Sequence, residues 1–155
     1  MSARRNKRKS DLLDGLMVAA PQLVADGLTF HMAVADRLGL SLADLRYLQL
    51  IASGEPATAG DISVRTGLTS GAVTRMVDRL EQAGYVRRTG DTTDRRRVVV
   101  VPTPHTVERI GSMYQGMAAA WRELLSAYTE EQLEIVLDLF QRMRGIGQRE
   151  AERLR

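Results

Sequence analysis

The sequence predicts a mainly α-helical fold with one two-stranded β-hairpin. Apolar residues recur at helical spacing over most of the 155 residues. Four consecutive valines, Val98 to Val101, are typical of a β-strand. A second strand candidate, Tyr85 to Thr89, lies on the other side of a loop that holds three consecutive arginines. The two strands therefore predict a hairpin whose tip is cationic.

Composition narrows the class of protein. The chain has no cysteine, which excludes a disulfide framework and a cysteine-ligated metal, and its two histidines lie far apart. No apolar run approaches the length of a membrane span, and no signal-peptide pattern follows the basic start. Phosphate-binding loops and nucleophile elbows are absent from the sequence. We expect a cytoplasmic protein that is not an enzyme, with no cofactor and no membrane partner.

The N-terminal part divides into a tail and a long helix. Residues 1–10 carry five basic and no acidic side chains and show no periodicity, so a disordered basic tail is expected there. Residues 11–155 are expected to form a single domain. Apolar residues recur at helical spacing from Leu12 to Leu38, and Gly39 ends the segment. Pro21 should kink this helix or mark a restart, because proline lacks an amide donor.

Two shorter helices follow. Ser41 and Asp44 form a start that resembles a capping box, with Asp in place of the usual Glu, for a helix through Ser53. Thr58 caps the next helix, and Gly67 turns the chain after it. These signals predict the first half of a helix-turn-helix arrangement.

The helix after the turn is the candidate recognition helix. Thr69 caps it, Gly84 closes it, and its apolar face consists of Val73, Met76, Val77 and Leu80. The opposite face presents Ser70, Gly71, Thr74, Arg75, Asp78 and Arg79. Arginine bonds guanine bidentately, hydroxyls reach base edges or phosphates, and a helix N-terminus favours phosphate. The alternative is a solvated face on which Arg75 and Arg79 pair with Asp78 or Glu81.

The hairpin tip points to the same function. Asp94 and Arg96, two residues apart, can form an ion pair that holds Arg96 extended for entry into a narrow minor groove. Arg95 and Arg97 would flank it near phosphates, with Arg88 at the hairpin base. A loop arginine cluster kept for solubility is the alternative. The residues assigned to DNA contact are Thr58, Thr69, Ser70, Gly71, Thr74, Arg75, Arg79, Arg88, Asp94, Arg95, Arg96 and Arg97.

Two long helices complete the chain. Thr103 and Pro104 predict the start of the first, with proline at its first turn. Thr129 and Gln132 form a capping box that opens the last helix. That helix is apolar along two stripes, one of Leu133, Val136, Leu137, Phe140 and Met143, the other of Ile135, Leu139 and Ile146. A partner subunit would cover what its own domain leaves exposed, so a homodimer is expected.

Residues Thr69 to Arg88, followed by Asp94 to Val100, resemble the MarR family of winged helix-turn-helix transcriptional regulators. The Asp-x-Arg of the family's wing matches Asp94 and Arg96. The start of its recognition helix and its Thr-Arg step match Ser70, Thr74 and Arg75. The chain departs from the family at residues 102–106, where Pro-Thr-Pro-His-Thr replaces Leu-Thr-x-x-Gly, and at Pro21.

The resemblance implies a winged helix-turn-helix lobe at residues 41–102, with dimerisation helices at 11–40 and 103–155. It also implies a homodimer on a palindromic operator in double-stranded DNA, acting as a repressor that a ligand releases. The alternative function is a winged-helix module used mainly for protein–protein interaction.

The resemblance further implies a small-molecule site between the dimer region and the DNA-binding lobe. His31 lies on the apolar stripe of the first helix, near where the family's pocket lies. Its candidate neighbours are Phe30, Arg46, Tyr47 and Trp121. Such a site would hydrogen-bond a small aromatic or phenolic effector. The alternative is a buried histidine whose hydrogen bonds are satisfied within the protein.

Overall fold

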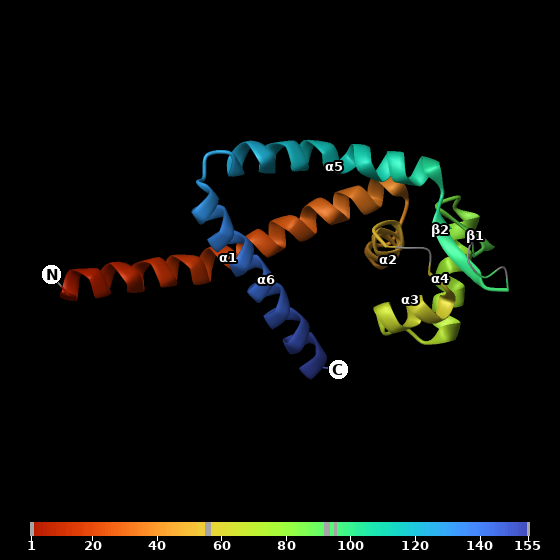
Figure 1. Ribbon diagram of the computed structural model, residues 1–155, viewed down its shortest axis with the longest axis horizontal. Coiled ribbons are helices and arrows are strands. Elements are labelled where there is room, and N and C mark those ends of the chain that lie inside the picture. Colours follow the sequence, from red (N-terminus) through yellow and green to blue (C-terminus); the bar gives the residue numbers. More distant parts are fainter. Residues whose placement is uncertain (1, 55–56, 92–93, 95, 155) are drawn as a thin grey trace. The chain divides into compact units, whose positions relative to one another are not determined.

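The structure is a computed structural model that describes residues 2–54, 57–91, 94 and 96–154. It is mainly helical with one antiparallel hairpin, as predicted. The elements, in order, are α1 (Ser2–Leu38), α2 (Leu42–Ala52), α3 (Ala59–Thr66), α4 (Ser70–Gln82), β1 (Val86–Gly90), β2 (Val98–Pro102), α5 (Pro104–Leu125) and α6 (Glu130–Arg153) (Figure 1). Two compact units are formed by residues 1–109 and 110–155. None of the described helices has a stretch apolar and long enough for a bilayer crossing.

The first helix is longer than the sequence suggested. Residues 2–10, for which disorder was expected, form the first turns of α1. Arginine and lysine have high helix propensity, so the basic composition of this segment is compatible with a helix. Pro21 lies inside the continuous helix, so the restart considered at this position does not occur.

Only the C-terminal end of α1 packs into the core of its unit. Val34, Ala35 and Leu38 are buried, whereas Leu13, Met17 and other large apolar side chains nearer the N-terminus are exposed. Gly39 ends the helix with a positive φ of 68°. The amide of Leu40 donates to the carbonyl of Ala35, 2.9 Å away, as a Schellman ending requires.

The start of α2 is capped, but its capping box is only half formed. The Ser41 hydroxyl accepts from the amide of Asp44 at 3.0 Å, as expected. The Asp44 carboxylate does not bond back to Ser41 and binds Arg79 of α4 instead. Asp44 is buried, and a tertiary ion pair there satisfies its charge better than a local amide would.

The helix-turn-helix is capped as the sequence predicted. Thr58 and Asp61 form a full capping box at α3, and Gly67 turns the chain with a φ of 70°. The Thr69 hydroxyl accepts from the amide of Ala72 at the start of α4. The predicted apolar face of α4 is buried: Val73, Met76, Val77 and Leu80 are at most 1% exposed.

Gly84 connects α4 to the hairpin. Its φ is 77°, and the amide of Tyr85 donates to the carbonyl of Leu80 at 2.8 Å, which completes a second Schellman motif. The strands then pair antiparallel with Arg88 opposite Val100. Strand β1 is shifted by one residue from the predicted Tyr85 to Thr89, and β2 runs one residue beyond its predicted end. The amide of Val100 also donates to the carbonyl of Ala57 ahead of α3. The hairpin is therefore tied to both helices of the helix-turn-helix.

Tyr85 joins the hairpin to the end of α1. Its buried hydroxyl donates to the carbonyl of Leu38 at 2.5 Å, and Arg109 of α5 lies over its ring. Arg109 also donates to the carbonyl of Arg37 at 3.3 Å. These bonds satisfy carbonyls that the last turn of a helix leaves without partners.

The first turn of α5 is held by hydrogen bonds to the carbonyls of Gly84 and Tyr85. Helix α5 begins at Pro104, the predicted position, despite the departure from the family pattern there. The fully buried Thr106 donates its hydroxyl to the carbonyl of Tyr85 at 2.8 Å, and the Thr103 hydroxyl donates to the carbonyl of Gly84. The hydroxyls of Thr103 and Thr106 thus supply the hydrogen bonds that position the start of α5.

The unit of residues 110–155 consists of the rest of α5 and α6. Thr129 and Gln132 form the predicted capping box of α6. No residue of α6 is buried, and its exposed apolar side chains include Ile135, Leu137, Leu139, Phe140, Met143 and Ile146. A helix of this kind leaves both of its apolar stripes open to further packing.

We predict that Tyr85→Phe destabilises the protein by about 1–2 kcal/mol, because the Leu38 carbonyl loses a buried donor while the ring is kept. Urea unfolding at fixed protein concentration measures this loss. Tyr128→Phe is the matched control, since Tyr128 is 44% exposed, and should change the free energy of unfolding by less than about 0.5 kcal/mol. Equal effects of the two substitutions would contradict the role assigned to the Tyr85 hydroxyl.

Candidate nucleic-acid interface

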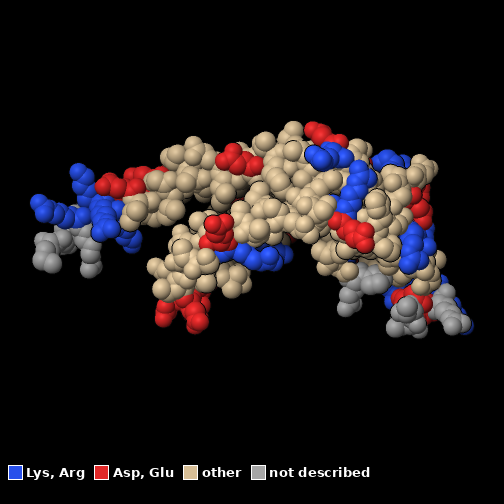
Figure 2. Space-filling model, turned by 90° about the horizontal axis from the view of Figure 1, so that it is seen from above, with Lys and Arg blue, Asp and Glu red and all other residues tan. Residues whose placement is uncertain are grey.

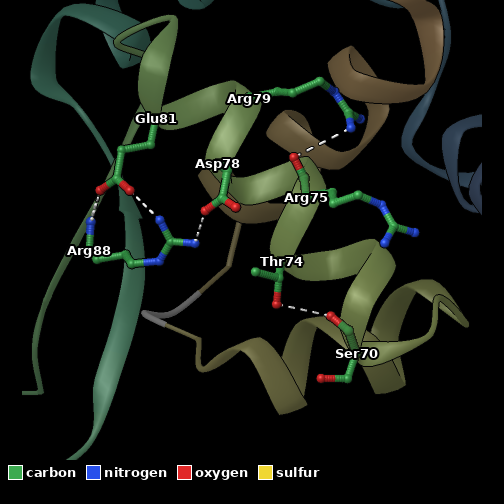
Figure 3. Close-up of polar contacts among 7 residues, drawn as sticks. All are labelled: Ser70, Thr74, Arg75, Asp78, Arg79, Glu81 and Arg88. Carbon is green, nitrogen blue, oxygen red and sulfur yellow. Dashed lines mark hydrogen bonds and ion pairs between the residues drawn. The ribbon is translucent and has the colours of Figure 1, made fainter.

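The exposed face of α4 carries the predicted recognition residues. Burial of the opposite face fixes its direction, and Ser70, Gly71, Thr74 and Arg75 are all exposed. The Thr74 hydroxyl donates to the carbonyl of Ser70 at 3.1 Å, and its oxygen keeps acceptor capacity (Figure 3). Gly71 adds no side chain of its own at this end of the helix. This face of α4 thus presents the hydroxyls of Ser70 and Thr74, a glycine without a side chain, and the guanidinium of Arg75.

Arg75 and Arg79 lie one helical turn apart but have different surroundings. Arg79 donates to both carboxylate oxygens of Asp44, with the shorter contact at 2.7 Å. Hydrogen bonding to Asp44 raises the pKa of the Arg79 guanidinium above its usual range. Arg75 makes no ion pair with any residue that the structure describes, and its side chain extends away from α4 (Figure 3). The DNA contact predicted for Arg79 stays a prediction, but its charge is matched inside the lobe.

Arg88 ties the hairpin to the recognition helix. From β1 its guanidinium contacts the carboxylates of Asp78, at 2.6 Å, and of Glu81, and its backbone amide donates to Glu81 at 2.9 Å (Figure 3). Hydrogen bonding to Asp78 is the main cause that raises the pKa of Arg88. The alternative in which Asp78 and Glu81 pair with arginines of α4 is therefore replaced by a pairing with the wing.

The wing tip is ordered differently from the prediction. Asp94 and Arg96 were expected to form an ion pair, and the structure has none between them. The Asp94 carboxylate instead accepts from the backbone amide of Arg96 at 3.0 Å, and its carbonyl accepts from the amide of Arg97 at 2.9 Å. This is an Asx-type turn, in which a short acidic side chain replaces a backbone acceptor. It fixes the backbone at Arg96 and leaves the exposed guanidinium unmatched by Asp94.

Arg97 and Thr58 link the wing base to α3. Arg97 contacts the carboxylates of Asp61 at 3.5 Å and of Asp91 at 4.0 Å. Thr58 donates to Asp61 through its hydroxyl and its amide, and these bonds lower the pKa of that carboxyl below its ordinary value. Arg95, also assigned to DNA contact, lies outside the described residues.

The arginines of this region therefore fall into two groups. Arg79, Arg88 and Arg97 each face a carboxylate on another element. Arg75, Arg87 and Arg96 face none among the described residues. Asp44, Asp78, Glu81 and Asp61 were the partners that sequence reasoning missed, because each pair joins residues that are 7 to 36 positions apart. A paired arginine positions elements, whereas an unpaired one keeps its charge for an external anion.

The predicted effector residues are only partly brought together. The rings of Phe30 and His31 meet edge to face at 5.9 Å. Nδ1 of His31 lies 2.7 Å from the carbonyl of Gly27, which fits the alternative of a satisfied histidine. Arg46 is exposed and Tyr47 half-buried on α2, and Trp121 is 48% exposed in the other unit.

A pocket of about 430 Å³ lies elsewhere, between the hairpin and the start of α5. It is lined by Arg87, Thr89, Gly90, Val99, Val101, Pro102, Pro104 and Val107. None of the five predicted effector residues lines it. Over the described parts of the chain, no three His, Asp or Glu side chains gather as a metal site.

Comparison with known proteins gives consistent matches. Residues 38–97 match the model of the MarR family. The HTH-type transcriptional regulator YcgE of Bacillus subtilis (strain 168) is 40% identical over 126 residues, which are 81% of this chain and 82% of that protein. Its name describes a regulator rather than an enzyme, in agreement with the expectation from the sequence.

Solved structures agree with the fold. The transcriptional regulator Tm0710 from Thermotoga maritima superposes with a TM-score of 0.59 at 26% identity, over 88% of this chain and 96% of that chain. The YusO protein from Bacillus subtilis has a TM-score of 0.61 at 23% identity, with the same coverage. The second likeness concerns the fold alone.

We predict that Arg88→Gln weakens DNA binding about fivefold, roughly 1 kcal/mol, because the wing loses its tie to α4. Since its charge is matched internally, the slope of log K against log salt should stay that of the wild type. Fluorescence anisotropy at several NaCl concentrations measures both. Arg87→Gln, which removes the same charge from the same strand without breaking a carboxylate pair, is the control. A slope reduced by about 0.9 would make Arg88 a phosphate contact instead.

For the wing tip, Asp94→Ala should weaken DNA binding by about 1 kcal/mol, because the Arg96 amide loses its acceptor. Asp94→Asn keeps an acceptor oxygen and removes the charge, so it should bind DNA at least as tightly as the wild type. Equilibrium titration of both variants on one duplex separates the two effects. If both variants bind more tightly by the same factor, Asp94 is only a repulsive charge near the phosphates.

Proposed function

We propose that this chain, which belongs to the MarR family of HTH-type transcriptional regulators, acts as a homodimeric repressor on a palindromic operator. In this proposal α4 enters the major groove and the wing enters the adjacent minor groove. A small aromatic or phenolic effector releases the protein from DNA. Membership of the family makes the chain a DNA-binding regulator.

One observation carries the assignment of the major-groove contact. Arg75 is exposed beside Ser70 and Thr74 on α4, and within the described residues it has no carboxylate partner. Neighbouring Arg79 is held by Asp44, so the two cations of this helix are not equivalent. A guanidinium with a free donor fork is suited to the O6 and N7 acceptors of guanine. Arg75 is therefore the residue proposed to read a base.

The homodimer is supported by apolar surface in each unit. In the first unit, α1 exposes Leu12, Leu13, Leu16, Met17, Val18, Leu23, Val24 and Leu28. In the second, α6 has no buried residue at all. Soluble monomers seldom expose contiguous apolar patches of such extent, so a second copy is the occupant proposed for these faces. Its two-fold symmetry would match a palindromic operator.

Sedimentation at low micromolar concentration should therefore show twice the chain mass of 17.2 kDa. The physical reason is the apolar surface of α1 and α6, so Leu139→Glu or Ile135→Glu in α6 should shift the protein toward the monomer. Val64→Glu is the control, because Val64 on α3 is 86% exposed outside these faces. A wild-type monomer at this concentration would refute the dimer and, with it, the palindromic operator.

The candidate effector site on α1 contains His31 and Phe30. His31 and Phe30 form a ring pair on α1, and the family resemblance implies a site in this region. Thermal shift with a phenolic carboxylate such as 4-hydroxybenzoate, on the wild type and on His31→Asn, tests the proposal. A shift that is the same in both proteins would remove His31 from the effector site.

Selection from a random duplex library provides the operator for the test of base reading. On this operator Arg75→Ala should cost about 1–3 kcal/mol, and on random duplex distinctly less, because a lost base contact reduces discrimination. Titration of both duplexes at one salt concentration measures the ratio. An equal loss on the two duplexes would make Arg75 a phosphate contact. The alternative of a winged-helix module used mainly for protein–protein interaction predicts that the wild type selects no sequence.

A further inference from the structure

The N-terminal end of α1 carries a concentrated positive charge. Arg4, Arg5, Lys7, Arg8 and Lys9 lie within six residues, and no acidic residue precedes Asp11. The segment is helical, and the side chains of Arg4, Lys7, Arg8 and Lys9 are exposed. Figure 2 shows Lys and Arg side chains gathered at this end of α1, ahead of the first acidic ones. We call residues 4–9 the basic segment.

No ion pair in the described part of the chain matches the charge of these side chains. None of the ion pairs there involves Arg4, Lys7, Arg8 or Lys9. Arg4 has Lys7 and Arg8 three and four residues ahead, the spacing at which like charges on a helix repel. The first turn of α1 contains no acidic residue to offset the helix dipole. An external polyanion would relieve this repulsion, whereas water and salt only screen it.

The composition of the segment favours duplex DNA over a membrane surface. Residues 2–10 contain no large apolar side chain, so this part of α1 has no apolar face to insert between lipids. Six helical residues span about 9 Å. A duplex of that length carries about five negative charges, at one per ~1.7 Å of axis. The linear charge densities of the basic segment and of B-DNA therefore match.

We propose that the basic segment is a second DNA-binding surface, separate from α4 and the wing, which binds duplex phosphates irrespective of base sequence. The proposal rests on the DNA-binding function above and adds a contact that no recognition residue supplies. Its ligand is the phosphate backbone, either of duplex that flanks the operator or of a second duplex. The segment would raise the affinity for all DNA and the dependence of that affinity on salt.

The test uses the full-length protein with all five basic residues changed to Gln. The matched control is Arg4→Lys, Arg5→Lys and Arg8→Lys, which keeps all five charges. Anisotropy titrations over a range of NaCl use random duplex, a minimal operator and an operator with long flanks. We expect the Gln variant to bind random duplex at least about tenfold more weakly, with a salt slope smaller by about 2 to 4, and the Lys variant to bind as the wild type. Circular dichroism and sedimentation check that both variants remain folded.

The duplexes separate the two sources of phosphate. A loss that is larger with long flanks than with the minimal operator assigns the contact to flanking DNA. An equal loss on both, with bridging of two labelled duplexes by the wild type alone, assigns it to a second duplex. An unchanged salt slope in the Gln variant would overturn the proposal. Binding of the wild type and the Gln variant to phosphatidylserine vesicles is also measured, and a Gln variant that loses vesicle binding but binds duplex as the wild type does would overturn it too. Failure of the proposed function is distinct, since the wild type would then prefer no operator.

Discussion

The candidate nucleic-acid interface depends on the burial of the opposite, apolar face of α4. Val73, Met76, Val77 and Leu80 fill the core of the lobe, and this packing turns Ser70, Thr74 and Arg75 outward. Burying four such side chains stabilises the lobe by several kcal/mol, at roughly 1.5–3 kcal/mol each before the entropy of ordering is subtracted. A rotation of α4 about its axis would therefore exchange apolar for polar groups in the core. The direction of the recognition residues is fixed by hydrophobic packing before any charge is considered.

Ion pairs then set the positions of the elements around α4. Asp44 holds Arg79 and so joins α2 to α4, while Arg88 joins β1 to two carboxylates of the same helix. Arg97 approaches Asp61 on α3. The pairs of Arg88 and Arg97 are partly exposed and each contributes little to stability, whereas Asp44 is buried, and together the pairs restrict how the wing lies against α4. Each of these three arginines thus has a carboxylate partner inside the protein, whereas Arg75 on α4 and Arg96 at the wing tip have none among the described residues.

Local signals in the sequence predicted the elements well. Thr58, Thr69 and Thr129 cap helices where expected, and the valine run pairs as a strand, because these features depend on neighbours a few residues away. Asp44 was taken as a capping residue only, since its partner Arg79 lies 35 residues further on. The same distance problem hid the partners of Arg88. Candidate residues could thus be identified from sequence, whereas the division of the arginines into paired and unpaired required the packed lobe.

Arg75 and Arg79 offer the most direct test, because they are the same residue type on one helix, a single turn apart. Each is changed to Gln, circular dichroism confirms that the variants are folded, and affinity for the selected operator is measured below the unfolding temperature. The sorting of arginines by their internal partners predicts a loss of about tenfold or more for Arg75→Gln and of less than about threefold for Arg79→Gln. Equal losses, or a larger loss at Arg79, would show that pairing with Asp44 does not withdraw Arg79 from DNA and would contradict the account.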